Sequence, residues 1–387
     1  MFKFINHACF QMEVDGYTCL VDPWFEGRVF NESWSLLEET NIDEVDLDNL
    51  KYIFYTHEHP DHLNWKTLNL IKKKCKNDLV VVLLERKNKN IVQAIKKMKI
   101  NVAEVQPNKL TTISKNLSIV QFPTEHDSAQ VFKIYDKVIL NQNDCYLSDA
   151  QAKSIKSMFP TIDYWFMQFS LAGFYANEGD TVGLRQAKDF HVGVFDNYKK
   201  LFNPKITIPF ASFVYFCKEK NKFLNNNIVK PLDIEEAYKE DSVYFLKPGD
   251  TEQECVENGR KSRVLYWQSL FDMPKKIYPH KFTSVEKIEK AFKKFINENE
   301  SMGPLLGRVE LYIIDHEKSI LLDHEEKKIS VCSGQDNIGK LYSEDLHAFY
   351  AFPWGADTLN ISSCFEVIDA ARWSRFLSVK DGMYERF

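Results

Sequence analysis

The stretch Thr56-His57-Glu58-His59-Pro60-Asp61-His62 decides the fold of this 387-residue chain. It follows the apolar run Lys51–Tyr55, which is typical of a buried strand, and it holds three histidines and one aspartate within six residues. On an extended segment His57 and His59 point to the same side, so both can bind one metal ion. The turn at Pro60 then brings the aspartate and the third histidine round to a second metal position. Imidazole and carboxylate groups together suit zinc, iron or manganese.

The segments around this histidine box alternate between strand and helix patterns. Short runs of β-forming residues between turn residues predict strands, and periodic apolar residues predict helices. The expected strands are Phe2–Ile5, Phe10–Val14, Thr18–Val21, Lys51–Tyr55, Leu79–Leu84, Leu117–Phe122, Lys137–Leu140, Tyr164–Phe169 and Lys205–Pro209, with helices over Trp65–Lys74, Ile91–Met98 and Thr181–Leu201. This order predicts an α/β fold in which two packed sheets have helices outside, an αββα sandwich.

The character of the chain changes near Lys247-Pro248-Gly249-Asp250. The following part is more charged, with expected helices over Val285–Asn297 and Ala370–Leu377 and expected strands over Glu310–Ile314, Ser319–Leu322 and Lys328–Val331. A chain of this length exceeds the size at which one hydrophobic core stops growing. We therefore expect a metal-binding catalytic domain over residues 1–250 and a smaller α+β accessory domain over residues 251–387.

The H-x-H-x-D-H pattern of the box resembles the signature of the metallo-β-lactamase superfamily, and the match is complete. The resemblance implies that His57, His59 and a later histidine hold one metal, and that Asp61 and His62 serve a second. By the family order, the later histidine is His126. The same order makes Asp144, at the end of another strand, the carboxylate that bridges both metals. Asp61 and Asp144 are then also the expected catalytic carboxylates.

The last histidine of that family is missing from this sequence. The stretch where it is expected reads Ile206-Thr207-Ile208-Pro209-Phe210-Ala211, so alanine stands in its place. His191 is a candidate substitute, although it precedes the strand and lies in an expected helix. Either the second metal is held with open positions or only one metal binds. His7 and the histidines at 280, 316, 324 and 347 lack ligand spacing, and we expect them to be structural or exposed.

The missing histidine points to a narrower resemblance, to the metallo-β-lactamase-like part of the CMP-N-acetylneuraminate hydroxylase family. The landmarks are Asp22-Pro23-Trp24-Phe25, the histidine box, Asp144-Cys145, the stretch 169–173 and Pro209-Phe210-Ala211. That family also carries a Rieske domain, which needs two Cys-x-His-type ligand pairs. This chain has none, so a hydroxylase of this sequence would take its electrons from a separate protein.

Residues near these landmarks are candidates for supporting roles. Asp22 follows an expected strand, where relatives place an acid that supports the metal-binding loop through a hydrogen bond. Trp24 and Arg28 are expected to wall the substrate pocket, with Arg28 pairing a phosphate or carboxylate. Tyr215 and Lys218 follow the altered strand end and are also expected to bind substrate. For each of them a purely structural role is the competing interpretation.

Composition restricts the partners. With 44% hydrophobic residues and a net charge of −5, the chain is typical of a globular protein, and it lacks the basic excess of nucleic-acid binders. No apolar run approaches membrane-spanning length, and the N-terminus has no signal-peptide pattern. The eight cysteines show no C-x-x-C pair, which indicates reduced thiols. We therefore expect a cytoplasmic protein that binds neither nucleic acid nor membrane.

Three functions fit these observations. In the first, one or two iron ions activate dioxygen to hydroxylate a small anionic molecule, such as an acidic or nucleotide-linked sugar. In the second, two zinc ions activate a water molecule that hydrolyses an ester, amide or phosphodiester. In the third, the site is vestigial and the chain is a binding module. The missing histidine and the narrower resemblance favour the first, while the superfamily at large favours the second.

Overall fold

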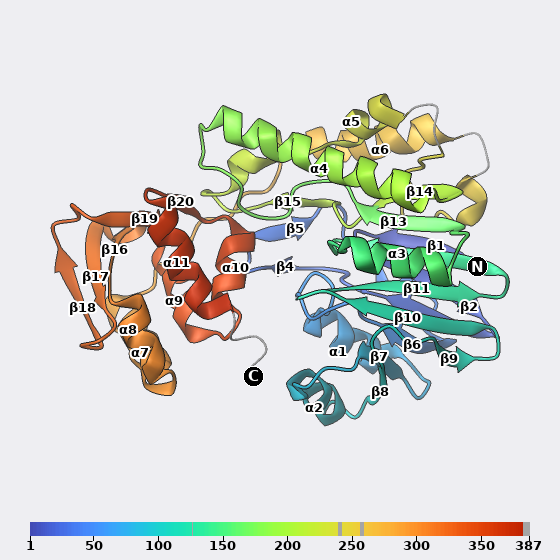
Figure 1. The fold of residues 1–387 in the computed structure, drawn as a ribbon, viewed down its shortest axis with the longest axis horizontal. Helices are drawn as coiled ribbons and strands as arrows, with labels where there is room; N and C mark the ends of the chain where they lie inside the picture. The colour runs from blue at the N-terminus through green and yellow to red at the C-terminus, as the bar shows by residue number, and fades with distance from the viewer. Residues whose placement is uncertain (126, 239–241, 256–258, 382–387) are drawn as a thin grey trace.

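The central part of the protein is a sandwich of two six-stranded sheets with helices on both outer faces (Figure 1). The computed structural model describes residues 1–125, 127–238, 242–255 and 259–381. The predicted αββα architecture is confirmed. The expected strands and helices of the first 210 residues are all present, with ends shifted by a few residues.

The first sheet holds the N-terminal strands, in the order β1-β2-β3-β6-β7-β8. Its strands are β1 (Phe2–Asn6), β2 (Cys9–Val14), β3 (Tyr17–Val21), β6 (Leu50–Phe54), β7 (Val80–Leu84) and β8 (Asn101–Val105). β3, β6, β7 and β8 run parallel, so the carboxyl ends of β3 and β6 lie at the same edge of the sheet. Helices α1 (Trp65–Lys74) and α2 (Asn90–Lys97) cover its outer face.

The second sheet has the order β14-β13-β12-β11-β10-β9. Its strands are β9 (Thr111–Ser114), β10 (Leu117–Pro123), β11 (Ser128–Ile134), β12 (Lys137–Asn143), β13 (Tyr164–Gln168) and β14 (Ile206–Phe210). Its outer face is covered by α3 (Asp149–Met158), α4 (Thr181–Phe202), α5 (Pro231–Tyr238) and α6 (Arg260–Asp272). A small sheet of β4 (Arg28–Val29), β5 (Trp34–Leu36) and β15 (Val214–Phe216) adjoins the sandwich.

Aromatic side chains fill the space between the two large sheets. Phe10 of the first sheet stacks on Phe166 of the second, with ring centroids 4.8 Å apart. Phe4 meets Phe210 edge to face at 5.9 Å. Alternation along each strand sends one set of side chains into this layer, and burying aromatic rings supplies much of the stabilisation. The core thereby holds the ends of β1, β6, β12 and β14 at one edge of the sandwich.

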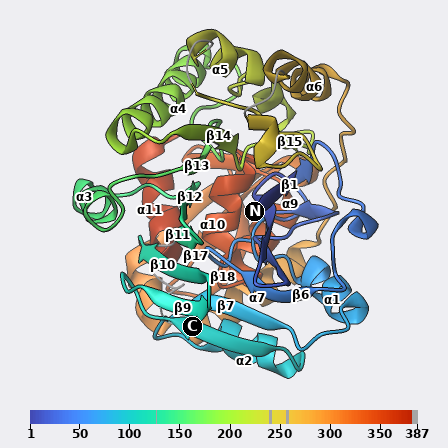
Figure 2. The same ribbon diagram turned by 90° about the vertical axis from the view of Figure 1, so that its right-hand side faces the viewer.

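The C-terminal part forms a second unit beside the sandwich (Figure 1), and in the view of Figure 2 it lies behind the sandwich. This unit has its own core. Its five-stranded sheet has the order β18-β17-β16-β19-β20, made of β16 (Arg308–Ile313), β17 (Lys318–Asp323), β18 (Lys328–Cys332), β19 (Asn337–Leu341) and β20 (Phe365–Val367). Its helices are α7 (Val285–Glu298), α8 (Gly303–Leu306), α9 (Ser343–Ala351), α10 (Gly355–Ser362) and α11 (Ala370–Asp381). Short 3-10 turns span Ile42–Glu44, Lys222–Asn226, Glu252–Cys255, Glu300–Met302 and Ile314–His316.

Helix α6 packs with the sandwich although it follows residue 250. Trp267 of α6 stacks on Phe213 with centroids 4.0 Å apart, and Val264 and Phe271 belong to the same cluster. The separate core of the second unit begins at Ile288. The division at residue 250 stays a prediction, and we propose that the first unit continues through α6.

Two further observations concern the whole described chain. None of its helices is both long enough and apolar enough to cross a membrane. All eight cysteines lie in the described ranges, and there they are unpaired, so no disulfide contributes to the fold.

Candidate metal centre

The histidine box lies in the loop between β6 and α1, and a buried carboxylate fixes the start of this loop. The backbone N–H of Thr56 donates to Asp22 Oδ1 at 2.8 Å, and its hydroxyl donates to Asp22 Oδ2 at 2.7 Å. Asp22 follows β3, whose neighbour in the sheet is β6. The predicted support of the loop by Asp22 is confirmed. After the turn at Pro60, Asn64 donates a side-chain hydrogen bond to the Pro60 carbonyl and caps α1.

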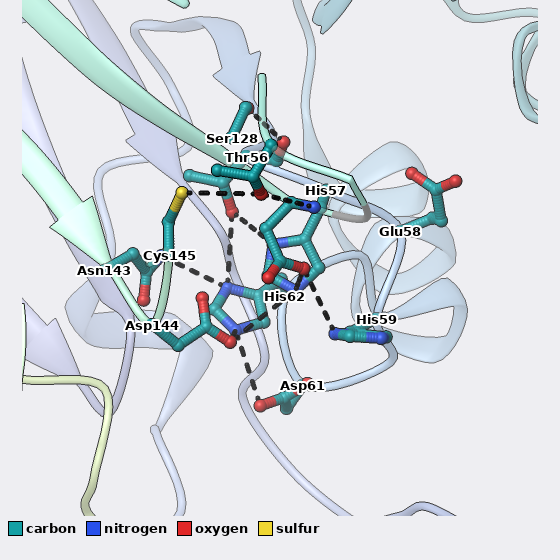
Figure 3. Close-up of polar contacts among 12 residues, drawn as sticks. Thr56, His57, Glu58, His59, Asp61, His62, Ser128, Asn143, Asp144 and Cys145 are labelled. Carbon is teal, nitrogen blue, oxygen red and sulfur yellow. Dashed lines mark hydrogen bonds and ion pairs between the residues drawn. The ribbon is translucent and has the colours of Figure 1, made fainter. Parts of the chain in front are cut away.

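The structure brings His57, His59 and Asp144 together at the edge of the sandwich (Figure 3). Each offers one ligand atom, and these atoms lie within 4.8 Å of one another. His57 Nε2 is 3.7 Å from Asp144 Oδ2. Asp144 reaches this point because it follows β12, which ends beside the box. We call these three residues the first cluster.

Asp127 is a carboxylate of this site that the sequence did not single out. Its Oδ1 lies 3.5 Å from His57 Nε2 and 3.7 Å from His59 Nδ1. His126, the ligand expected here, lies outside the described residues and its assignment stays a prediction. The available signal was position, since Asp127 directly follows His126 and precedes β11.

Asp61 and His62 face a second point beside the first. His62 Nε2 is 3.4 Å from Asp61 Oδ2 and 3.4 Å from Asp144 Oδ2. Asp144 Oδ2 therefore stands between a histidine of each group, where a bridging carboxylate is expected. His7 joins Asp61 and His62, with its Nε2 3.4 Å from Asp61 Oδ2. We call His7, Asp61 and His62 the second cluster.

The ring nitrogens that point away from the clusters are held by neighbouring groups. His57 Nδ1 lies 3.0 Å from the Thr56 hydroxyl, and His62 Nδ1 lies 3.1 Å from Asp22 Oδ2. His59 Nε2 lies 2.9 Å from Oδ2 of Asp357, which belongs to α10 of the second unit. Hydrogen bonds of this kind orient histidines that bind metals and set their tautomers.

The nitrogen and oxygen atoms that face into the clusters lack hydrogen-bond partners. These are the atoms that would bind a metal ion. The buried atoms without a partner include His57 Nε2, His62 Nε2, Asp61 Oδ1, Asp127 Oδ1 and Asp144 Oδ1. Leaving so many buried polar atoms unpaired is unfavourable, and binding of an ion is a standard reason for such a cluster. Nitrogen and carboxylate donors suit zinc, iron or manganese. The donor set therefore fits a transition-metal ion.

Electrostatics within the site separate the two carboxylates near His57. Burial and the neighbouring Asp144 charge raise the pKa of Asp127 to about 6. Burial would also raise the pKa of Asp144, but His62 and His57 outweigh it and hold that pKa below its usual range. Asp144 is thus the carboxylate that the surrounding histidines keep ionised.

Ala211 occupies the position at which the family's last histidine is expected. Ala211 follows β14, and its backbone N–H donates to the carbonyl of His7 at 2.8 Å. His191 contacts two tyrosines: its Nε2 lies 2.6 Å from the Tyr175 hydroxyl and its Nδ1 lies 3.3 Å from the Tyr146 hydroxyl. Both nitrogens of His191 are therefore engaged within the fold.

The four residues expected to bind substrate are placed in different surroundings. Trp24 is buried and meets the His7 ring edge to face at 5.6 Å. The Arg28 guanidinium lies over the Tyr278 ring and pairs with Glu32. Lys218 is buried and pairs with Glu344 at 2.7 Å. Tyr215 pairs with β5 in the small sheet. Their binding roles stay predictions.

A cavity of about 620 Å³ opens beside the first cluster and is lined in part by His57 and His59. Its walls come from the β7–α2 region, including Leu84, Arg86, Lys87 and Ile91, and from the second unit, including Trp354 and Asp357. Cavities of this size commonly hold small molecules. The sequence did not predict this cavity because its two walls lie far apart along the chain.

Residues 17–143 match the family model described as "Beta-lactamase superfamily domain". This stretch begins at β3, includes the histidine box and ends one residue before Asp144. Together with the two-sheet architecture, the match defines a metallo-β-lactamase-type fold for this part of the chain.

Among individual proteins, the chain is similar to cytidine monophosphate-N-acetylneuraminic acid hydroxylase. It is 35% identical to the Danio rerio protein over 72 residues, which cover 18% of this chain and 12% of that protein. It is 22% identical to the Cricetulus griseus protein over 268 residues, which cover 64% of this chain and 47% of that protein. The matches thus span at most about half the length of these relatives.

Two solved structures also align with the chain. CmlA, a diiron β-hydroxylase from Streptomyces venezuelae, aligns with a TM-score of 0.40 and 14% identity, covering 54% of this chain and 44% of that chain. A possible metal-dependent hydrolase from Veillonella parvula aligns with a TM-score of 0.45 and 13% identity, covering 64% of this chain and 97% of that chain.

Proposed function

We propose that the protein is an iron-dependent hydroxylase of a small anionic molecule. The observation that carries the proposal is the donor set of the first cluster, two imidazoles with carboxylates beside them. Two histidines and one carboxylate with open positions are the usual ligands of non-haem iron oxygenases. His57 and His59 supply the imidazoles, and Asp144 supplies the carboxylate, with Asp127 adjacent.

Iron held there would supply dioxygen activation, and the protein's own residues would do the rest. Asp144 stays ionised between the two histidine groups, and Asp22 and Asp357 fix the outward nitrogens of His62 and His59. Asp127 Oδ1 lies 3.5 Å from His57 Nε2, so this carboxylate would help to neutralise a bound ion.

The overall reaction must balance without an electron-donating centre on this chain. Hydroxylation converts R–H, dioxygen, two electrons and two protons into R–OH and water. The two electrons come from a separate electron-transfer protein, since the chain lacks the paired Cys-x-His ligands of a Rieske centre. The cavity beside His57 and His59 is the proposed place of the substrate, with Arg86 and Lys87 as the cationic residues of its wall.

The substrate class rests on the similarity to CMP-N-acetylneuraminic acid hydroxylase. That protein's name describes an acidic sugar linked to a nucleotide. A related acidic or nucleotide-linked sugar is therefore our first choice for this chain. The apolar wall formed by Leu84, Ile91 and Trp354 would pack against the less polar face of such a ligand.

A dinuclear zinc hydrolase is the second candidate. Asp61 within the box favours it, because its Oδ2 lies beside His62 Nε2 and Oδ1 is unpartnered, which suits a carboxylate that orients a water molecule. In that case the substrate would be an ester, amide or phosphodiester. Both candidates place the same residues around the metal.

Metal identity separates the two. The protein would be produced with iron and zinc both available, and its metal content measured by plasma mass spectrometry. Iron, together with oxygen consumption that needs both a reductant and an added acidic sugar, supports the hydroxylase. Zinc, together with hydrolysis of a phosphodiester or lactone and no oxygen uptake, would replace it with the hydrolase. Protein that retains neither metal contradicts both.

A further inference from the structure

We propose that His7 takes the place of the missing last histidine, so that His7, Asp61 and His62 hold a second metal ion beside the first. This inference rests on the proposed metal-dependent function and deepens it. It assigns a metal-binding role to a residue in the turn between β1 and β2, where the sequence pattern indicated none.

The first argument is the position of His7 relative to Ala211. Ala211 stands where the superfamily's last histidine is expected, and its backbone N–H donates to the His7 carbonyl at 2.8 Å. The two residues are thus neighbours across the ends of β1 and β14, which belong to different sheets. A histidine side chain from position 7 enters the site beside the vacant side-chain position at 211.

The second argument is the direction and surroundings of the His7 ring. Its Nε2 lies 3.4 Å from Asp61 Oδ2, and its ligand atom falls within 4.8 Å of those of Asp61 and His62. The side chain is only 1% exposed, so water cannot satisfy it. The edge of Trp24 packs against the ring and fixes its orientation.

The third argument is the number of unpaired atoms at this point. His62 Nε2 and Asp61 Oδ1 are buried without hydrogen-bond partners, as is the other ring nitrogen of His7. A neutral hydrogen bond between His7 and Asp61 would leave the His62 nitrogen and the second Asp61 oxygen unsatisfied. One cation bound by all three residues would give both the Asp61 oxygen and the His62 nitrogen a partner.

The ligand set also specifies the class of metal. Two imidazoles and one carboxylate suit a divalent first-row ion such as iron, manganese or zinc, and leave positions open. Asp144 Oδ2, 3.4 Å from His62 Nε2, can bridge from the first cluster.

The test compares metal content in four proteins, each reconstituted with Fe²⁺ or, separately, Co²⁺ and freed of excess ion by gel filtration. They are the wild type, His7→Ala, the double variant His7→Ala with Ala211→His, and His324→Ala as a buried-histidine control. Outer hydrogen-bond partners change metal affinity by about 10–100-fold, so a direct ligand should change it by at least about 100-fold. We expect two ions per chain in the wild type and the control, and one in His7→Ala. The double variant should regain the second ion.

Readouts other than activity keep the proposal testable. The visible absorption of bound Co²⁺ reports the donor set, and its second-site component should vanish in His7→Ala and return in the double variant. If His7→Ala does not fold, which circular dichroism of the metal-free protein would reveal, His7→Asn replaces it in the same comparison. His7→Ala that binds two ions with wild-type affinity overturns the proposal.

Failure of this inference is distinguishable from failure of the proposed function. A wild type with one ion that depends on His59 would leave the metal-dependent function standing and remove His7 from the ligand set. A wild type with no ion under any reconstitution would remove both. A second ion lost in His7→Ala but not regained by the double variant supports His7 and shows that position 211 cannot present a histidine to the same point.

Discussion

The metal centre, made of the first and second clusters, differs from another group of histidine and carboxylate side chains in how its charges are balanced. At the metal centre, histidine nitrogens and carboxylate oxygens converge with no Lys or Arg side chain among the partners described above. At the boundary between the two units, Lys218, His280, Glu344 and Asp345 form what we call the junction cluster. There, Lys218 Nζ lies 2.7 Å from Glu344 Oε1, and His280 Nδ1 lies 2.9 Å from the same oxygen.

The difference teaches that residue types alone do not define a metal site. The junction cluster also contains a histidine, two carboxylates and the nearby Cys364, and its ligand atoms are close enough for a metal. However, its lysine already supplies a positive charge against Glu344. At the metal centre, where His62 and His57 already lower the pKa of Asp144, we expect a bound cation to add positive charge. The first cluster and Asp61–His62 should therefore respond to metal, and the junction cluster to the loss of its lysine.

The largest expected effect is the loss of metal in His59→Ala. This change removes one of the two imidazoles of the first cluster, so the chain should no longer retain the first metal and should lose activity. The fold should remain, because the aromatic core between the sheets does not depend on His59. Plasma mass spectrometry and circular dichroism check both points, with His316→Ala as a control outside the clusters. Normal activity with unchanged metal content would falsify the site assignment.

The next effect tests the junction cluster. Lys218→Met removes the lysine that pairs with Glu344 in a buried setting and leaves only His280 beside this carboxylate. Breaking a buried pair by removing one partner costs about 3–5 kcal/mol. Urea unfolding should show this loss while metal content stays at the wild-type level. Lys222→Met is the matched control, since the Lys222–Glu219 pair is exposed and such pairs contribute about 0–1 kcal/mol. Loss of metal in Lys218→Met would contradict the distinction between the metal centre and the junction cluster.

The same comparison explains what the sequence predicted and what it could not. His57, His59, Asp61 and His62 are local in sequence, so one strand and one turn suffice to predict their arrangement. Asp357 reaches His59 from 298 residues away, and only the packing of the second unit brings it there. No periodicity or motif carries that information.

His7 is intermediate between the local histidine box and the distant Asp357 in its sequence separation from the residues that it contacts. It is 54 residues from Asp61, and its approach depends on β1 and β14 ending side by side in two different sheets. The one available signal was its place two residues after the expected strand Phe2–Ile5. Lys218 is a second case. A lysine after the altered strand end predicts a substrate contact, and this stays a prediction. Its partner Glu344 lies 126 residues further along the chain, where no sequence pattern could have paired the two.

A smaller effect is expected from Asp357→Asn, which tests whether the second unit orients His59. Asn keeps the shape but loses the charge that holds His59 Nε2. Outer partners of this kind change metal affinity by about 10–100-fold, so first-site affinity should fall within that range in a chelator competition. Asp336→Asn is the control, because Asp336 pairs with Arg372 on the surface of the same unit. Equal affinities in the two variants would show that Asp357 does not position His59.

The smallest expected effect concerns a buried histidine that belongs to neither the metal centre nor the junction cluster. His324 Nδ1 lies 2.7 Å from the Gly307 carbonyl and its Nε2 lies 2.9 Å from the Tyr350 hydroxyl. Burial lowers the pKa of His324 to about 4, against an ordinary value of about 6.5. The neutral form thus satisfies both nitrogens with uncharged partners, unlike His59 or His280, which face carboxylates.

The sign of the pH effect follows from this lowered pKa. Between pH 6.5 and pH 4 the unfolded chain binds a proton at His324 that the folded protein does not, so the stabilisation is complete above that range and is lost as the pH falls through it. Going from pH 7 to pH 5, His324 should account for about 2 kcal/mol of lost stability. Urea unfolding of metal-free wild type and His324→Gln at both pH values isolates this part, because the cluster histidines contribute equally to both proteins. An equal pH dependence in the two would mean that His324 titrates alike in the folded and unfolded states, and that burial between neutral partners does not set it apart from the histidines of the two clusters.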